Sequence, residues 1–326
     1  MHYPTDSNLL LDAMRKSLFL SSDLCIKYDI SDLRQYKYNF KQLKYALRAI
    51  QKANRGRVNL EKKIVIYKEY MTLAQKQLAK IATVLTDIEQ IPTLSTIDIV
   101  IMEEIRGYMD HVRRQLDHIE RRVIHGEVIP HGEKVFSIFE PHTEWVSKGK
   151  AGVPVELGVR VCILEDQHQF ILHHRIMEHE TDSTVAVKMV ESSQKKFPQL
   201  SSASFDKGFH SQENQELLSD MLDLAALPRK GRLSKANKEI ESRDEFRKAR
   251  KQHPAVESAI NALEVHGLDR CRDHGIDGFK RYVALAVVTR NIHRIGDVLH
   301  KREQKILERQ ARRLKAANSG QFRLIA

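Results

Sequence analysis

The sequence predicts an α/β protein in which a block of helices precedes a mixed sheet. Residues 1–130 carry apolar side chains at helical spacing, whereas short β-rich runs appear only after Gly126. A further short strand then ends at Asp206 and is followed by another helical run. Strands that alternate with helices in this way indicate an α/β domain. The 326 residues provide enough chain for such a domain and a separate helical one.

Four helices are expected in the first block. Thr5 follows a proline and precedes an acidic residue, which marks the start of the first helix. The other three are expected over residues 31–53, 59–90 and 95–124. Consecutive helices with short connections pack as an antiparallel bundle, so a bundle is the expected architecture.

The second part of the chain begins with strands. They are expected over residues 135–139, 155–163 and 170–176, with the last two forming a hairpin, and a helix capped at Thr181 follows. Further along, the expected elements are a strand ending at Asp206, a helix over 212–222, a strand over 224–227, a charged segment over 233–252, a helix over 254–265, a buried helix over 278–295 and a basic, solvated helix over 298–326. The expected domains are therefore residues 1–130, 131–297 and 298–326.

The composition favours a polyanionic partner. The formal net charge is +11 and the pI is near 9.4, which suits binding to phosphates. Cys25, Cys162 and Cys271 are too scattered for a metal motif or a disulfide framework. No secretory signal and no apolar run of about 18 residues is present, so a cytoplasmic protein without a membrane partner is expected.

The stretch SSASFDKGFHS, residues 201–211, is the first candidate site. It places Asp206 at the C-terminal end of a predicted strand, where reactive groups collect in open α/β sheets. Gly208 would allow a sharp turn with a positive φ. The alternative is that Asp206 only opens an Asx turn.

Glu257 is the second candidate carboxylate. His253, Glu257 and Asn261 recur every four residues and would share one helix face, which is either a solvated stripe or part of a site. If Asp206 and Glu257 meet, their oxygens suit Mg²⁺. No HExxH, P-loop, GxGxxG or nucleophile-elbow pattern occurs, which argues against a zinc site, a nucleotide-binding loop and a serine hydrolase.

Several blocks of sequence resemble DDE transposases of bacterial insertion sequences, in particular the ISNCY group. The blocks are SIFEPHTEWVSKGKAG, VELGVRV, SFDKGFHS, HPAVESAINALEVHGLDRC and GFKRYVALAVVTRN. The resemblance extends over most of the chain and is densest from Phe136 to Gly296. It implies an RNase H-like core that carries a helical insertion, and cutting and joining of double-stranded DNA at insertion-sequence ends. A homodimer on DNA is the expected assembly.

The resemblance also implies roles for the candidate residues. The family uses three acids that hold Mg²⁺ or Mn²⁺; Asp206 matches the second acid and Glu257 the third. His253 stands where relatives carry an arginine, so a supporting role is expected for it and for Asn261. The basic residues expected to contact the DNA backbone, unless they are plain surface charge, are Lys148, Lys150, Arg229, Lys230, Lys280, Arg281 and Arg290.

The first acid is where this sequence departs from the family. In relatives it lies in a strand shortly before a HYPTD segment, whereas this sequence begins MHYPTD. The expectation is an N-terminally truncated transposase that is inactive as given, unless Glu140 or another acid substitutes. The alternatives are a DNA-binding remnant without catalysis and an RNase H-like nuclease without joining activity.

Overall fold

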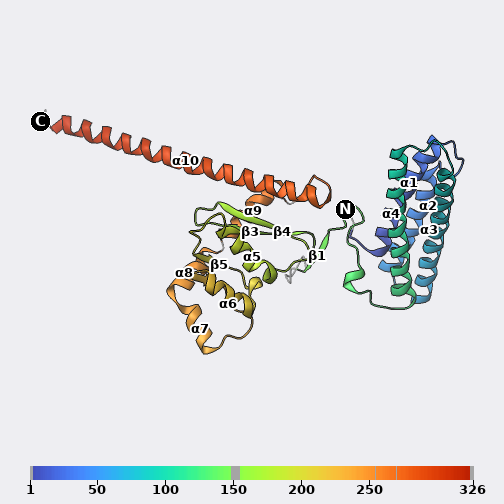
Figure 1. Cartoon of the computed structure of the whole chain (residues 1–326), viewed down its shortest axis with the longest axis horizontal. Coiled ribbons are helices and arrows are strands. Elements are labelled where there is room, and N and C mark those ends of the chain that lie inside the picture. Colours follow the sequence, from blue (N-terminus) through green and yellow to red (C-terminus); the bar gives the residue numbers. More distant parts are fainter. Residues whose placement is uncertain (1–2, 148–154, 254, 269, 324–326) are drawn as a thin grey trace. The chain divides into compact units, whose positions relative to one another are not determined.

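The computed structural model describes residues 3–147, 155–253, 255–268 and 270–323. The chain divides into two compact units, Met1–Trp145 and Val146–Ala326. Long helices dominate the first unit, and the second combines helices with short strands (Figure 1). The expectation of an α/β chain with an N-terminal helical block is therefore confirmed at this level.

The first unit contains the four predicted helices. They are α1 (Asp6–Lys27), α2 (Tyr36–Arg55), α3 (Leu60–Glu89) and α4 (Thr96–Ile119), the last extended by a π-helical turn (Glu120–Ile124). Side-chain oxygens of Thr5, Asn59 and Ser95 accept backbone N–H bonds at the starts of α1, α3 and α4. Only α2 begins later than predicted, by five residues.

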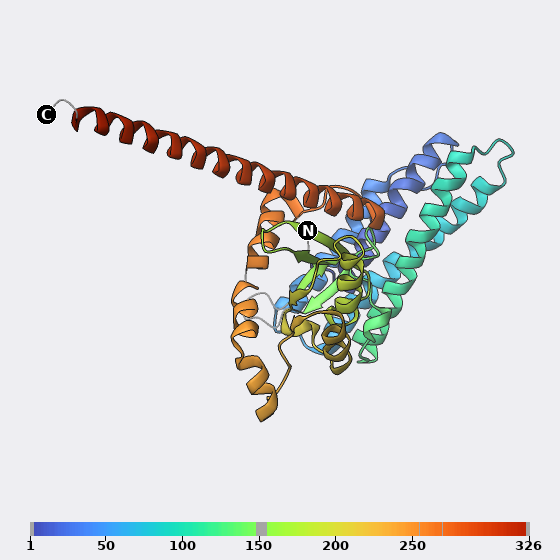
Figure 2. The same cartoon turned by 60° about the vertical axis from the view of Figure 1, so that its left-hand side comes forward.

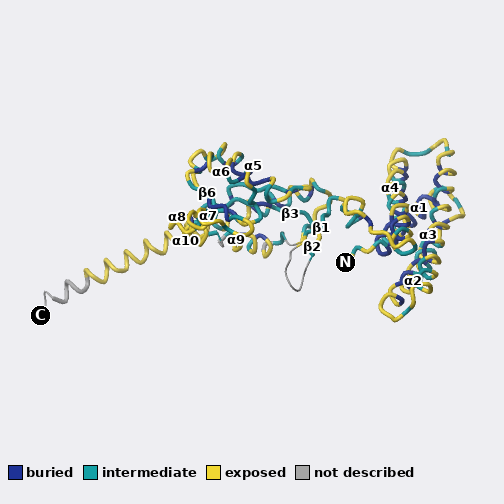
Figure 3. Tube along the Cα trace, turned by 90° about the horizontal axis from the view of Figure 1, so that it is seen from below, coloured by how far each residue is buried: buried dark blue, intermediate teal, exposed yellow. Residues whose placement is uncertain are grey.

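One core joins these four helices. Each helix contributes a stripe of apolar side chains to this core. Figure 3 colours the buried residues of these helices dark blue. Leu10, Met14 and Leu18 of α1 are fully buried, and so are Tyr70 and Ile81 of α3. The Tyr70 hydroxyl donates to the Ser7 carbonyl oxygen at 3.0 Å, which satisfies that polar group inside the core.

A buried carboxylate lies between α1 and α4. The Asp98 side chain is only 2% exposed, and its Oδ2 accepts hydrogen bonds of 2.5 Å from Lys27 Nζ, Tyr28 Oη and Ser95 Oγ. These bonds, first that from Lys27 and then those from Ser95 and Tyr28, hold the pKa of Asp98 well below its ordinary value. The charged form of Asp98 therefore stabilises the first unit.

Replacing Asp98 with Asn should lower the melting temperature of the first unit at pH 7. A depressed pKa gives stability that is present above the unfolded value, near pH 4, and is lost as the pH falls below it. The difference between wild type and Asp98→Asn should therefore shrink between pH 5 and pH 2. Thermal melts followed by circular dichroism measure it.

Asp29→Asn is the matched control for this change. The Asp29 carboxylate is 96% exposed and pairs with Arg34, and its backbone has φ 57°, which Asn tolerates. This variant should show a small difference from wild type across the same pH range. An Asp98→Asn difference that stays constant down to pH 2 would contradict the role given to the charge.

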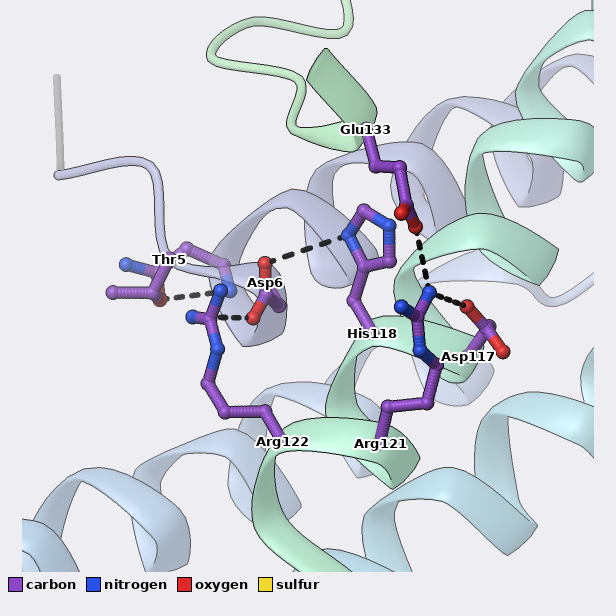
Figure 4. A network of polar contacts seen from close by, with 8 residues as sticks. Thr5, Asp6, Asp117, His118, Arg121, Arg122 and Glu133 are labelled. Carbon is purple, nitrogen blue, oxygen red and sulfur yellow. Dashed lines mark hydrogen bonds and ion pairs between the residues drawn. The ribbon is translucent and has the colours of Figure 1, made fainter. Parts of the chain in front are cut away.

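Ion pairs close one end of the helical unit. Asp6, in the first turn of α1, lies 2.7 Å from Arg122 and 3.9 Å from the buried ring of His118 (Figure 4). Arg121 pairs with Asp117, and also with Glu133 beyond the end of α4. These contacts fix the start of α1 against the end of α4. Burial lowers the pKa of His118, so its neutral form is favoured.

Short strands and helices alternate in the second unit. The strands are β1 (Glu144–Ser147), β2 (Val155–Gly158), β3 (Arg160–Glu165), β4 (Ile171–Met177), β5 (Ser202–Ser204) and β6 (Leu224–Ala226). The helices are α5 (Asp182–Gln194), α6 (Gln212–Met221), α7 (Lys235–Ser242), α8 (Asp244–Gln252), α9 (Ala255–Leu263) and α10 (Gly275–Arg323). The predicted hairpin is confirmed, since β3 pairs antiparallel with β4 from Arg160↔Met177 to Glu165↔Ile171.

Two strand predictions were wrong. Residues 135–139 form no strand; their apolar side chains pack individually instead, with Ile138 buried in the helical core and Phe136 beside Trp145. The run over 155–163 divides into β2 and β3 at Gly158, which has φ 158°. The apolar character of both runs was identified correctly, but it serves packing rather than one continuous strand.

The described strands form three pairs, β1–β2, β3–β4 and β5–β6, where one mixed sheet was expected. Strands β5 and β6 have three residues each, which leaves them few ladder bonds. They run parallel, with Ser202 opposite Leu224 and Ser204 opposite Ala226, and α6 connects them. This β–α–β arrangement determines where Asp206 lies.

The C-terminal helix differs most from its prediction. A single helix of 49 residues, α10, replaces the two helices expected over 278–295 and 298–326, so the expected boundary at residue 297 falls inside it. Gly296 does not interrupt it, because one glycine in a long helix costs only about 1 kcal/mol. The segment 278–295 is also not buried as expected; Val283 and Val287 are buried, whereas Leu285 and Ile292 are exposed. No helix in the described part of the chain is long and apolar enough to cross a bilayer.

Candidate functional site

Asp206 lies just beyond the C-terminal end of β5, as predicted. Its side chain is 79% exposed and precedes a short 3₁₀ turn, Lys207–Phe209. Parallel strands end at the same edge, so the loop that follows β6 lies beside it. Lys230 of that second loop donates from Nζ to the Gly208 carbonyl oxygen at 2.9 Å. The predicted carboxylate, Asp206, and the predicted basic turn around Lys230 therefore lie at the same strand edge.

The Asp206 loop is bonded to α6, and α6 is bonded to α5 through the same side chain. Asn214 of α6 donates from Nδ2 to the carbonyl oxygens of Phe209, at 2.8 Å, and Ser183 in α5, at 2.7 Å. Gly208 is needed here for a close approach, since a Cβ on it would lie 2.5 Å from Asp182 Oδ2. The positive φ expected for Gly208 was wrong, because it is not among the glycines with positive φ. The loop is thus positioned by packing as well as by turn geometry.

His253 contacts both β5 and Asp206. Its Nδ1 lies 3.1 Å from Ser204 Oγ, and its Nε2 lies 3.7 Å from Asp206 Oδ1. The ring is 23% exposed, so the protein covers most of it. If the Ser204 hydroxyl donates to Nδ1, then Nε2 carries the proton and presents it toward the carboxylate.

The expected helix face that joins His253 to Glu257 is not formed. His253 is the residue that ends α8, and Pro254, which follows in the sequence, has no N–H to continue that helix. Glu257 and Asn261 lie on α9, where both are exposed and Ala259 and Leu263 are buried. His253 therefore contacts Asp206, whereas Glu257 lies on the exposed face of α9 together with Asn261.

A metal site is not complete in the described residues. The carboxylates of Asp206 and Glu257 are the right donor type for Mg²⁺ or Mn²⁺. However, no three His, Cys, Asp or Glu side chains gather closely enough, among the residues that the structure describes, to hold an ion. Glu140, the expected substitute acid, lies in the first unit with its carboxylate 3.6 Å from His142 Nε2.

Arg229 and Lys230 are the two predicted DNA contacts that lie at the Asp206 edge. Arg229 donates to Gln212 Oε1 at 3.4 Å. Burial, followed by the positive charges of Arg229 and Lys230, lowers the pKa of His210 in the neighbouring loop. This edge of the β5–β6 pair therefore has two basic side chains, Arg229 and Lys230, close to an exposed carboxylate.

The other predicted DNA contacts lie elsewhere. Lys280 Nζ is 2.5 Å from Glu178 Oε1, and Arg281 Nη2 is 3.2 Å from Asp273 Oδ2. Arg290 is half-buried, and its charge acts on the carboxyl of Glu165. Lys148 and Lys150 lie outside the described residues.

Sequence reasoning missed Ser204 and Asp182 as parts of this site. Ser204 could have been found, because it lies two residues before Asp206 and alternate residues share a face where a strand is extended. Asp182 could not, since its approach to Gly208 depends on how α5 packs against the loop. No protein-family model, curated protein or solved structure matches the chain. The fold and the site therefore define the class only as an α/β protein with an exposed carboxylate and two basic side chains at one strand edge.

Proposed function

We propose that this chain is a DDE-type transposase for double-stranded DNA at insertion-sequence ends, with an RNase H-like core, and that it is inactive unless another acid joins Asp206 and Glu257. The observation that carries the proposal is the exposed Asp206 at the C-terminal edge of two parallel strands, next to Arg229 and Lys230. A DNA backbone is attracted to such an edge, because its phosphates are complementary to the basic side chains. The sequence blocks that resemble the family include both Asp206 and Glu257.

The residues have separate roles in this proposal. Asp206 and Glu257 would hold Mg²⁺ or Mn²⁺, and the ion would neutralise the charge that develops at the phosphate. Arg229 and Lys230 hold the backbone of the strand at the β5–β6 edge. His253 is a positioning residue: it holds the Asp206 carboxylate from one side, while Ser204 fixes the orientation of the ring. Cleavage of a phosphodiester depends on such positioning and charge.

The test is cleavage of a supercoiled plasmid with Mg²⁺ or Mn²⁺. If the wild type cleaves, Asp206→Asn should abolish that metal-dependent cleavage and leave DNA affinity within about threefold, because a metal ligand is lost and no phosphate contact is removed. Asp220→Asn, an exposed acid on α6, is the matched control and should cleave like wild type. An Asp206→Asn protein that still cleaves after repurification would exclude the assignment.

A second candidate function is DNA binding without catalysis. The observation that favours it is the lack of a three-residue metal group among the described side chains. In that case wild type binds DNA and shows no cleavage with either metal. An RNase H-like nuclease is separated from both by offering pre-cleaved ends, which only a transposase joins to a target.

A further inference from the structure

A stripe of exposed apolar side chains runs along α10. Its members, which we call the α10 stripe, are each between 49% and 66% exposed: Leu285, Val288, Ile292, Ile295 and Leu299. They are spaced by three and four residues in turn, which is the a and d pattern of a heptad repeat. Side chains of this size and number are rarely left in water along one continuous face.

The α10 stripe is separate from the face that packs on the hairpin. That second face carries Val283 and Val287, which are buried, and Asn291, whose side-chain amide bonds both backbone groups of Ile171 at 3.0 Å. At about 100° per residue, the two faces point roughly a third of a turn apart. The hairpin therefore leaves the stripe uncovered, and Figures 1 and 2 show α10 continuing beyond the rest of its unit.

A heptad pattern of this kind fits another helix with the same period. A second copy of α10 supplies one, and a two-fold axis makes such a contact self-complementary. The charges on α10 decide whether the two helices pack parallel or antiparallel. In a parallel pair the next two d positions would place Arg302 against Arg302 and Arg309 against Arg309, inside a distal segment, residues 300–315, that has seven basic and two acidic residues.

An antiparallel pair avoids this repulsion. When the two-fold axis passes near residues 293 and 294, the distal segments of the two copies point to opposite ends. The central layers then place Val288 against Leu299 of the second copy, and Ile292 against Ile295. Each layer is apolar. Gly296, beside the seam, leaves room for the second helix to approach.

We propose that the α10 stripe is the contact surface for a second copy of this chain, and that the two α10 helices pack antiparallel over residues 285–302. The proposal is independent of the enzymatic activity. It accounts for the exposed apolar stripe. Beyond the stripe most a and d positions are basic, with Arg302, Arg309 and Arg313, and Ile306 is the exposed apolar residue among them.

The oligomeric state of the full chain tests the contact. Light scattering coupled to size exclusion should give a dimer for wild type and a monomer for Ile292→Glu, with the helix content of the two proteins unchanged. Leu314→Glu is the matched control: Leu314 is 66% exposed on the same helix but lies outside the overlap, so this variant should remain a dimer. A wild type that is monomeric at its highest soluble concentration overturns the proposal, whether the stripe is then bare or covered by the helical unit.

Disulfide formation tests the direction. In a background with Cys271→Ser, Val288→Cys and Leu299→Cys chains should cross-link when mixed, and neither should cross-link alone. In the antiparallel pair, two copies of position 288 are offset by eleven residues, about 16 Å, which is too far for a disulfide. Cross-linking of each chain with itself, with no disulfide between positions 288 and 299 in the mixture, would show a parallel pair and overturn the arrangement.

Discussion

The affinity of this chain for double-stranded DNA should fall by roughly 10³ or more between 50 and 200 mM salt, if six or more phosphates are contacted. The net charge of +11 and the basic side chains of Arg229 and Lys230 at the β5–β6 edge are the reasons, because each neutralised phosphate releases counterions. Fluorescence anisotropy with a labelled duplex, titrated at several salt concentrations, gives the slope of log affinity against log salt. A flat slope would remove the claim of phosphate binding.

Charge-removing variants locate the contact. Changing Arg229 and Lys230 together to alanine should reduce that slope by about one to two, and weaken binding to all sequences alike. Arg106→Ala is the control, because this arginine pairs with Glu89 and Glu103 in the helical unit. Equal losses for the two proteins would mean that only net charge matters and that the β5–β6 edge is not a specific contact.

Asn291→Ala should destabilise the second unit by about 2–4 kcal/mol. The alanine cannot make the two hydrogen bonds to the backbone of Ile171, a residue that is only 4% exposed. An unpaired buried backbone group costs about 1–3 kcal/mol. The loss also weakens the docking of α10 on the hairpin, where Val283 and Val287 are buried. Urea unfolding, followed by far-ultraviolet circular dichroism, measures the change in the free energy of unfolding.

Gln310→Ala is the comparison for this variant. Gln310 is exposed on the distal part of α10, so its loss should change the free energy of unfolding by less than about 0.5 kcal/mol. If Asn291→Ala changes the free energy of unfolding as little as Gln310→Ala does, water replaces the Asn291 amide at the edge of β4. In that case the side chain does not hold α10 in place.

Features set by neighbouring residues could be predicted from the sequence. Thr5, Asn59, Ser95 and Thr181 precede helices because their side chains suit the first turn, and all four helices begin within one residue of them. The strand that ends before Asp206 could be predicted in the same way, from its length, its small residues and the polar turn that follows. Local sequence features therefore predicted these helices and this strand, and with them the position of Asp206.

Features that depend on contacts between distant residues were missed. The apolar residues 135–139 resemble a strand, but none of the described strands pairs with them, and Val135 and Ile138 pack against the helical core instead. His253 was expected on one helix face with Glu257, but it follows α8 and contacts Ser204 and Asp206, which lie about fifty positions away in the sequence. The exposure of residues 278–295 on α10 was missed, because an exposed apolar stripe has the same spacing in the sequence as a buried one. Burial, unlike periodicity, is decided by what packs nearby.

The bonds from Asn291 to Ile171 have a consequence for synthesis of the chain on the ribosome. The two residues are 120 positions apart, so the outer edge of β4 is made long before the side chain that covers it. At about 5–20 residues per second, that edge waits roughly 6–24 s for its partner. During this interval the nascent hairpin offers an open edge to other strands. Chaperones that shield nascent chains should therefore raise the yield of folded protein, and slower translation should lower it.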